Sequence, residues 1–538
     1  MEYKAILFDT RSIQRYIYSG NMMKTNIGAS YIVENVFEKI LVGEILQGTE
    51  EKPGLYFGQV DNTSRYEESP DWEVMNTACK IAYIGGGNAL ILFKADESVE
   101  KLEKVVQLFT RELLTRYPGL STGSAIGMID STPGKTYRDT RQKLYKKLKK
   151  NQNTIYPLLN PPYTGLTQIC HIDGEKANCY YTGRNVEQRY ISQETAAKIE
   201  NIDMATKSLN EKFSNERGKY VFPSKPEDFG QVAGESYVAI VHVDGNNMGK
   251  KFTGCEDLTQ YSKMSRAVAK KARLAFASLV KECIEYIPAV DAEYWIPSYD
   301  EKNKGVAYLP IRPLILGGDD VTFICAGRWA LQLTTRLMQL MNERSGDSEV
   351  DKRLPNGIDC CGGIAILPLK YPFSRGYELA EQLCSEAKKQ SRNKPGSSWL
   401  DFAVLHGEQG IDLADIRKQE YTGRLIPNMH FGPYEVNSDR TSVDIQCLKD
   451  ELELLFGAVK EKNLAKGKLK ELRFVLQETE IEIQNYQLQM ARLKTAIPMA
   501  DAWREYGDSL WAVNGKGIAV TPLVDAIEMM DFYLPGVK

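Results

Sequence analysis

The sequence has little of three things that mark specialised classes of protein: charge of one sign, long apolar runs and cysteine. Its 68 lysines and arginines nearly balance 71 aspartates and glutamates, so the net charge is −3 and any nucleic-acid contact needs a local basic patch. No run approaches the ~20 apolar residues of a membrane helix, and the N-terminus lacks a signal-peptide core. Ten cysteines in 538 residues are too sparse for a disulfide framework. These absences predict a cytoplasmic protein without a membrane partner.

The remaining composition is that of a globular protein with several domains. At ~150 residues per domain, a chain of 538 residues predicts three or four domains. A hydrophobic share of 43% and a charged share of 26% exclude wholesale disorder. No Ser-His-Asp or Cys-His arrangement stands out, so catalysis through a protein nucleophile is not expected.

Two parts of the chain repeat the same order of predicted elements. Each begins with a buried strand that ends in an aspartate, Asp9 in the first part and Asp244 in the second. A glycine-tipped hairpin follows at similar spacing, at residues 81–93 and 312–325. Each part then has a third strand and a lysine-rich helix, with the strands at 123–129 and 362–369. We therefore expect an α+β fold in which an internal duplication gives two units, each with helices on one face of a mostly antiparallel sheet.

The second hairpin carries acidic residues at its tip, which reads Gly317, Gly318, Asp319 and Asp320, and strand pairing brings Asp244 to the same sheet edge. Carboxylates and a triphosphate complete the oxygen shell that Mg²⁺ prefers. Two such ions ~3.5–4 Å apart activate an attacking hydroxyl and stabilise a leaving pyrophosphate. The glycines permit a tight turn and leave space for a phosphate. The motif favours a metal site at the three aspartates, and the alternative is a purely polar turn.

Basic and backbone groups near this edge are candidates for binding the triphosphate. A helix N-terminus after Asp244 offers free N–H groups, and lysine and arginine supply countercharge. The candidates are Gly245, Asn246, Lys250, Gly317, Gly318, Lys388, Lys389 and Arg392. The run GNNMGK is one residue too short for a P-loop and has no Ser or Thr after its lysine, which excludes that motif.

The first hairpin differs because its tip, from Gly85 to Asn88, carries no carboxylate. Asp9 alone cannot assemble a two-ion site, so we expect a catalytically silent lobe that keeps a capacity to bind a nucleotide or RNA. The helix after its third strand carries the most basic stretch of the chain, with Lys143, Lys146, Lys147, Lys149 and Lys150. These lysines contact phosphates or, as charge runs more often do, form a solvated face.

Four motifs of the second part carry a resemblance to a known family: HVDGNNMGKKF, YLPIRPLILGGDDVTFI, GGIAILPLKYPFSRGYELAEQLCSEAKK and SSWLDFAVLHG. They resemble the second palm domain of the large, polymerase-like subunit of type III CRISPR effector complexes. In the first part, GASYIVENV and GGGN resemble that family's degenerate first palm. In the second part, AKKQSRN is similar to the end of the cyclase domain of diguanylate cyclases. The resemblance covers residue 1 to about residue 408.

This resemblance implies two ferredoxin-like palm domains related by pseudo-twofold symmetry, which condense ATP 3′-5′ into cyclic oligoadenylate messengers with Mg²⁺ or Mn²⁺ in antiviral defence. By motif position, Asp244, Asp319 and Asp320 match metal-binding residues, and Lys388 matches a phosphate-contacting residue. RNA and small effector subunits are the implied partners. Two alternatives stay open: a non-catalytic palm scaffold that binds RNA or a partner, and a stand-alone defence cyclase that makes cyclic mono- or dinucleotides.

The chain departs from the family's pattern in two places. It lacks the His-Asp doublet of the nuclease that often opens the subunit, so DNA cleavage is not expected. Many relatives have a four-cysteine zinc module between the palms, whereas here Cys170, His171 and Cys179 remain and Asp173 stands where a second CxxC cysteine falls. Too few ligands remain for tetrahedral zinc, and we interpret this segment as a metal-free relic.

The predicted domains follow from these elements. From residue 442 leucines recur at helical spacing, which predicts a helical C-terminal domain that docks small partner subunits, as in the family, or only caps the second palm. The predicted divisions are a first palm at 1–152, a linker at 153–232, a second palm at 233–408, a connector at 409–440 and the helical domain at 441–538.

Overall fold

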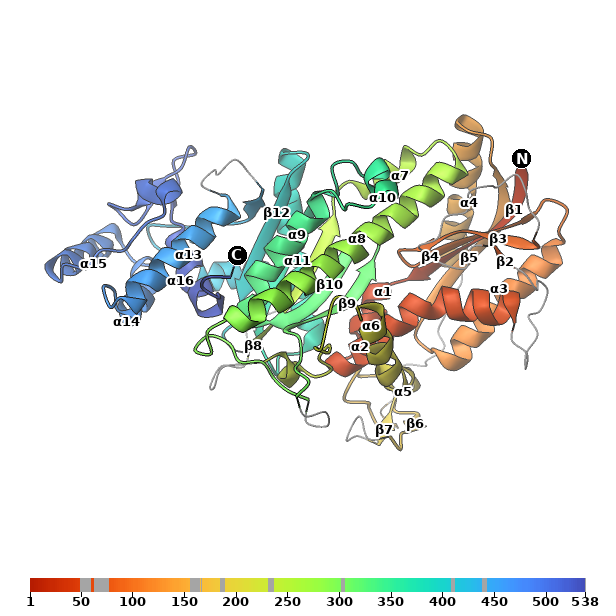
Figure 1. Ribbon diagram of the computed structural model, residues 1–538, viewed down its shortest axis with the longest axis horizontal. Coiled ribbons are helices and arrows are strands. Elements are labelled where there is room, and N and C mark those ends of the chain that lie inside the picture. The colour runs from red at the N-terminus through yellow and green to blue at the C-terminus, as the bar shows by residue number, and fades with distance from the viewer. Residues whose placement is uncertain are drawn as a thin grey trace.

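The computed structural model describes most of the chain. The described residues are 1–48, 60–61, 77–154, 165, 167–183, 189–230, 237–300, 305–407, 412–437 and 443–537. The predicted domain boundaries at 232–233, 408–409 and 440–441 fall outside them. In Figure 1 a first sheet lies at one end, a second sheet in the middle and the C-terminal helices at the other end. None of the described helices is long and apolar enough to cross a membrane.

The first sheet has the strand order β2-β3-β4-β1-β5. Its strands are β1 (Glu2–Arg11), β2 (Val60–Asp61), β3 (Cys79–Gly85), β4 (Asn88–Lys94) and β5 (Ser121–Asp130). Its helical segments are α1 (Ile13–Tyr18), α2 (Met23–Asn35), η1 (Val36–Gln47), α3 (Val99–Arg116) and α4 (Lys135–Thr154). The middle of β1 is apolar on both faces because Leu7 packs under α4 while Phe8 contacts Phe37 of η1 and Phe109 of α3. We call this sheet and its helices the first lobe.

The second sheet has the strand order β13-β12-β11-β8-β10-β9. Its strands include β8 (Tyr237–Gly245), β9 (Ile311–Gly317), β10 (Asp320–Ala326), β11 (Cys360–Pro368) and β12 (Ser398–Val404). Its helical segments are α7 (Met248–Thr253), α8 (Leu258–Tyr286), η3 (Ile287–Ala289), η4 (Gly327–Trp329), α9 (Ala330–Asn342), α10 (Ser348–Arg353) and α11 (Phe373–Asn393). We call this sheet and these helices the second lobe. Together the two lobes give the α+β fold that the sequence predicts.

Helices cover both faces of the second sheet, which corrects the expectation of one covered face. A Cβ added at Gly362 would meet Met338 of α9, whereas a Cβ added at Gly363 would meet Leu383 of α11. Neighbouring strand residues point to opposite faces, so α9 and α11 lie on opposite sides of β11. The long helix α8 packs beside α9 (Figure 1). Both faces need cover because the central strands are apolar on both of them.

The two lobes share one strand arrangement and one irregularity. In each lobe the first strand lies between the second hairpin strand and the third strand, as β4-β1-β5 and as β10-β8-β11, all antiparallel. Each hairpin also has a bulge three residues before the glycine that closes it, at Ala82 before Gly85 and at Leu314 before Gly317. A bulge is a specific feature of a strand, so matching bulges support the predicted repeat.

The lobes contact each other reciprocally at these bulges. The hydroxyl of Ser30 on α2 donates to the carbonyl oxygen of Leu314, and the hydroxyl of Ser262 on α8 donates to the carbonyl oxygen of Ala82. Each lobe therefore satisfies the bulge carbonyl of the other with a serine from its own helix. Such paired contacts are what a pseudo-twofold relation between the lobes requires.

The linker between the lobes contains a small hairpin and two helices that pack on the first lobe. Its elements are β6 (Cys179–Tyr180), β7 (Tyr190–Ile191), α5 (Gln193–Glu200), α6 (Ile202–Lys212) and η2 (Pro226–Phe229). Ser192 caps α5 by accepting from the backbone N–H of Thr195 at 2.9 Å. Lys198 of α5 donates to the carbonyl oxygen of Tyr16 and to the Ser19 hydroxyl, which fastens the linker to the end of α1.

The connector is more regular than predicted, because it contains α12 (Leu413–Glu420) and β13 (Tyr434–Val436), and β13 pairs with β12. The last part of the chain has a short hairpin besides its predicted helices. Its elements are α13 (Ile445–Lys460), α14 (Lys466–Val475), α15 (Glu480–Arg492), η5 (Asp501–Tyr506), β14 (Ala512–Val513), β15 (Ala519–Val520), α16 (Leu523–Met529) and η6 (Met530–Phe532).

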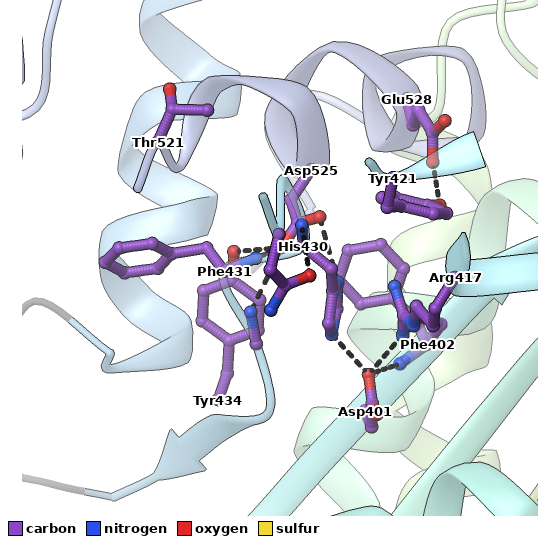
Figure 2. Close-up of polar contacts among 12 residues, drawn as sticks. Asp401, Phe402, Arg417, Tyr421, His430, Phe431, Tyr434, Thr521, Asp525 and Glu528 are labelled. Atoms are coloured by element: carbon purple, nitrogen blue, oxygen red, sulfur yellow. Dashed lines mark hydrogen bonds and ion pairs between the residues drawn. The ribbon is translucent and has the colours of Figure 1, made fainter. Parts of the chain in front are cut away.

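A buried ionic cluster joins the connector to the second sheet and to the C-terminal helices (Figure 2). His430 forms ion pairs through Nε2 with Asp401 of β12 at 2.8 Å and through Nδ1 with Asp525 of α16 at 3.0 Å. Arg417 of α12 pairs with Asp401 at 2.9 Å, and the Tyr434 hydroxyl donates to Asp525 at 2.8 Å. We call these five residues the His430 cluster, and they hold three segments of the chain together.

The cluster favours a protonated histidine. Burial and Arg417 oppose a charge on His430, but Asp525 and Asp401 outweigh them and raise its pKa. The same contacts lower the pKa of Asp525 against the effect of its burial. A raised histidine pKa contributes stability that is complete below the ordinary pKa of about 6.5 and is lost as the pH rises through the folded value.

We expect His430→Gln to lower the free energy of unfolding by about 3 kcal/mol at pH 6, because it removes the cation paired with the buried Asp525 and one of the two cations paired with Asp401. The loss should shrink toward pH 9, since the wild-type protein then loses the same charge. Chemical denaturation across this range measures both effects, with the exposed residue His406 changed to Gln as the control. Losses of equal size at both ends of the range would contradict the role of the His430 charge.

Candidate active site

Two predicted site residues meet at the ends of adjacent strands. Asp244 lies at the end of β8 and Asp320 begins β10, and the antiparallel register pairs them directly. Directly paired side chains share one face of a sheet. The contact of Lys388 with Asp244 identifies this face as the one under α11. The fold therefore brings together two carboxylates that are far apart in the sequence.

The β9-β10 turn places Asp319 against β8. Gly318 and Asp319 form its two-residue tip, and Gly318 has a φ of 81° whereas Asp319 has no positive φ, which is typical of a type II′ turn. The carbonyl oxygen of Asp319 accepts from the N–H of Gly245 at 3.2 Å. A Cβ added at Gly245 would lie 2.7 Å from the Cβ of Asp319, so only glycine at this position allows the hairpin tip to come so close.

The side chain of Asp320 is partly buried, in a way that opposes its charge. Its Oδ1 atom is buried without a hydrogen-bond partner, and Nδ1 of His242 lies 3.4 Å from it. Burial and then the neighbouring charge of Asp319 raise the pKa of Asp320 to about 7. Burial also raises the pKa of Asp319. The site thus holds carboxylates whose ionised form gains from a bound cation.

Lysines from two helices supply countercharge to these acids. Lys388 of α11 makes an ion pair with Asp244, and burial lowers the pKa of Lys388. Lys251 of α7 lies near enough to Asp319 to work against the effect of burial on that carboxyl's pKa. The side chains of Asp244, Asp320 and Lys388 remain 24%, 25% and 31% exposed, so the site is open to a ligand.

Three other basic residues predicted to bind phosphate lie on exposed parts of the same helices. Lys250 on α7 and Arg392 on α11 are exposed. Lys389 is exposed as well and pairs with Glu386 at 2.6 Å. Neighbouring residues on a helix point about 100° apart, so Lys389 cannot share the direction of Lys388.

Asn246 serves the packing of the second lobe. Its side-chain amide donates to the Ser391 hydroxyl at 3.0 Å and to the carbonyl oxygen of Ser397 at 3.2 Å. Its backbone N–H donates to the carbonyl oxygen of Asp359 at 2.7 Å. Asn246 therefore fastens β8 to the end of α11, and this N–H group is already occupied.

His242 is a site residue that the sequence reasoning missed. It lies two positions before Asp244 on the same face, and its Nδ1 is 3.1 Å from the hydroxyl of Thr322, its partner on β10. Burial, with a smaller effect of Lys388, lowers the pKa of His242 to about 4, so the ring is neutral at pH 7. A histidine inside an otherwise apolar strand, two residues before the acid, was the available signal.

In the first lobe, the position that corresponds to Asp320 is not an acid. Asp9 pairs directly with Asn88 in the register of β1 and β4. The amide of Gln152, near the end of α4, donates to Oδ2 of Asp9 at 2.6 Å, where the second lobe has Lys388 on Asp244. Leu7 pairs with Leu90 at the positions of His242 and Thr322. The polar layer beneath the acids thus belongs to the second lobe.

The oxygen atoms of the three aspartates are of the kind that binds a divalent cation. In this structure, however, the side chains do not converge on one point. Among the described residues, no group of three or more His, Cys, Asp or Glu side chains is arranged to hold a metal. Lys388 neutralises Asp244 instead. The unbonded Oδ1 of Asp320 and the paired position of Asp244 nevertheless give hard oxygen donors at one edge.

The interpretation of the linker segment as a metal-free relic stays a prediction. Its Asp173 carboxylate accepts from the Thr195 hydroxyl at 2.6 Å, from the Ser192 hydroxyl and from the Glu175 N–H at 3.0 Å. Cys170 is buried, with its sulfur 3.8 Å from the Thr195 hydroxyl. Hydrogen bonds to Asp173 therefore organise this loop.

Comparison with protein families finds a match for the segment that forms most of the second lobe. Residues 237–395 match the family described as Cas10/Cmr2, second palm domain. This match confirms the resemblance of that segment to the large subunit of type III CRISPR complexes. No curated protein matches the chain.

Among solved structures, the chain is similar to the Csm1-Csm4 cassette. The cassette in complex with cA3 is 14% identical, with 99% of this chain and 69% of that chain covered and a TM-score of 0.49. The cassette in complex with one ATP is 12% identical, with 99% and 70% covered and a TM-score of 0.49. At such identities and TM-scores these likenesses assign no ligand to this chain.

Proposed function

We propose that the chain is a metal-dependent nucleotidyltransferase that condenses ATP into cyclic oligoadenylate-type messengers. The observation that carries this proposal is the direct pairing of Asp244 with Asp320, beside Asp319, in a domain that matches the Cas10 second palm. Carboxylates in this number, next to lysines, suit a triphosphate with its divalent ions better than they suit packing alone.

In the proposed reaction the 3′-hydroxyl of one nucleotide attacks the α-phosphorus of another. The new bond joins that oxygen to phosphorus, the bond to the β-phosphate bridging oxygen breaks, pyrophosphate leaves and the hydroxyl proton passes to solvent. Asp244, Asp319 and Asp320 would hold Mg²⁺ or Mn²⁺, which supplies activation of the hydroxyl and stabilisation of the leaving group when bound. Lys388 would leave its ion pair with Asp244 and bind the triphosphate. Its positive charge would offset the negative charge of the phosphates.

The shared register, bulges and reciprocal serine contacts lead us to propose two palm domains that arose by duplication, at 1–152 and 233–408. The linker at 153–232, the connector at 409–440 and the helical domain at 441–538 complete this division. We propose that only the second palm is catalytic, because the first has Asn88 where the second has Asp320.

The proposed setting is a type III CRISPR-like defence complex in the cytoplasm. Small effector subunits would dock on exposed apolar side chains of α14 and α15, which include Phe474, Ile481 and Leu488. A genomic neighbourhood without other CRISPR subunits would instead favour the stand-alone cyclase. The non-catalytic scaffold is the alternative that the Lys388–Asp244 ion pair favours, since it neutralises one acid without a metal.

Incubation of the purified chain with each NTP and Mg²⁺ or Mn²⁺, with and without candidate RNA, followed by mass spectrometry of the products, tests the proposal. We expect a cyclic adenylate product, and a loss of at least about 100-fold in Asp244→Asn and Asp320→Asn. Asp9→Asn in the first lobe is the matched control and should keep the activity. Absence of product under every condition would leave only the scaffold.

We also propose that the first lobe binds RNA along α4. Lys143, Lys146 and Lys149 are exposed there and, within the described residues, have no acidic partner. Lys147 donates to the carbonyl oxygen of Ile126 at 2.8 Å and remains exposed. A row of uncompensated cations on one helix complements a phosphate backbone.

The triple variant Lys143→Gln, Lys146→Gln and Lys149→Gln should weaken binding of single-stranded RNA by about tenfold at low salt and reduce the salt dependence by about two contacts. Fluorescence anisotropy across a salt series measures both. A control with the same loss of charge replaces the exposed residues Lys281, Lys460 and Lys462 by Gln. Equal weakening in the two triple variants would refute a specific surface on α4.

A further inference from the structure

Tyr18 of the first lobe packs into the second lobe near its acid site. Tyr18 is the last residue of α1, and only 4% of it is exposed. Its ring stacks on Tyr377 of α11, with centroids 3.7 Å apart and planes 18° from parallel. The His242 ring lies edge-to-face against Tyr377 at 5.6 Å. Tyr18 therefore crosses the interface between the lobes and enters the α11 face of the second sheet, with α1 lying between the two sheets in Figure 1.

Three polar atoms in this region are buried without a hydrogen-bond partner: the hydroxyls of Tyr18 and Tyr377 and Oδ1 of Asp320. Buried polar atoms are nearly always bonded, so a group of unbonded ones indicates a missing partner. The His242 ring, which packs on Tyr377, also lies 3.4 Å from Oδ1 of Asp320 through Nδ1, so these side chains belong to one cluster. After burial, the charge of Asp320 raises the pKa of Tyr18 and the neighbouring Thr322 hydroxyl lowers it. A tyrosine hydroxyl is a suitable donor to a carboxylate oxygen.

We propose that Tyr18 is a positioning residue for Asp320. Its hydroxyl, directly or through one water molecule, holds the Asp320 carboxylate in the orientation that binds a divalent ion. This inference rests on the proposed function only because it takes Asp320 as a metal ligand. The first lobe has no acid pair of its own, and through Tyr18 it completes the acid site of the second lobe.

Tyr16 differs from Tyr18 in the direction that its ring faces. Tyr16 lies on the same helix and also has a buried hydroxyl without a partner. Its ring, however, lies under the ammonium group of Lys198 at 4.2 Å, so it faces the linker. The two tyrosines offer the same chemistry in two directions, and only Tyr18 points to the acids.

The second lobe offers an independent comparison. Phe252 lies eight residues after Asp244, as Tyr18 lies nine residues after Asp9, and it contacts Tyr261 of α8 with ring centroids 5.0 Å apart. Arg141 of α4 donates to the carbonyl oxygen of Phe252 at 3.1 Å, so this residue too meets the opposite lobe. Phe252 thus meets the first lobe through its backbone carbonyl, whereas Tyr18 enters the second lobe with a side chain that carries a hydroxyl.

Tyr18→Phe removes one oxygen and keeps the stacked ring, and Tyr16→Phe is the matched control. Mn²⁺ titration of the full chain without nucleotide, followed by electron paramagnetic resonance, measures the site, with Asp320→Asn defining the part that depends on Asp320. We expect Tyr18→Phe to weaken that part about tenfold and Tyr16→Phe to leave it unchanged. Thermal unfolding of both variants should stay close to the wild-type midpoint, because each keeps its packed ring and loses only one oxygen.

Equal Mn²⁺ affinity in the wild-type protein and Tyr18→Phe overturns the proposal, and so does an equal loss in Tyr16→Phe. If the wild-type protein makes no nucleotide product while Tyr18→Phe still weakens Mn²⁺ binding, the positioning role stands and the proposed function falls. If Asp320→Asn leaves Mn²⁺ binding unchanged, both fall.

Discussion

Carboxylates held side by side at the ends of two adjacent strands are the constraint on which the second lobe depends. Like charges at directly paired positions are unfavourable, and burial of Asp320 adds to that cost. The surrounding groups reduce the cost only in part: Lys388 neutralises Asp244, while one oxygen of Asp320 stays unbonded. An arrangement that lowers stability and leaves charge unsatisfied is typical of a binding site.

The first lobe has the same strand arrangement but no pair of adjacent carboxylates. Its register, its bulge and its central strand match those of the second lobe, but Asn88 replaces the second acid and Gln152 satisfies Asp9. The leucines beneath Asp9 pack without polar atoms, whereas His242 and Thr322 form a polar layer beneath Asp244 and Asp320. Comparison of the two lobes therefore distinguishes the features that the sheet needs for folding from the polar residues that only the second lobe adds for chemistry.

The repeat of strand, hairpin, strand and helix was readable from the sequence because burial and turn chemistry are local signals. The pairing of Asp244 with Asp320 followed from that repeat. Helices on both sheet faces, the strand β13 and the His430 cluster were not predicted, since each depends on contacts between distant segments. Tyr18 was hidden for the same reason, because nothing within β1 and α1 indicates that its ring enters the other lobe. Asn246 matched a ligand position in the sequence, but its amide bonds hold two elements together.

The most direct measurement is the free energy of unfolding of Asp320→Asn against the wild-type protein, with and without Mg²⁺. A carboxyl whose folded pKa is raised to about 7 destabilises the fold as the pH rises above its ordinary value near 4, and the effect is complete above pH 7. The account predicts that Asp320→Asn is more stable than the wild-type protein by roughly 1–3 kcal/mol at pH 8 without metal. It also predicts that Mg²⁺ stabilises only the wild-type protein. A variant that is less stable at pH 8, or that gains as much from Mg²⁺ as the wild-type protein does, would contradict it.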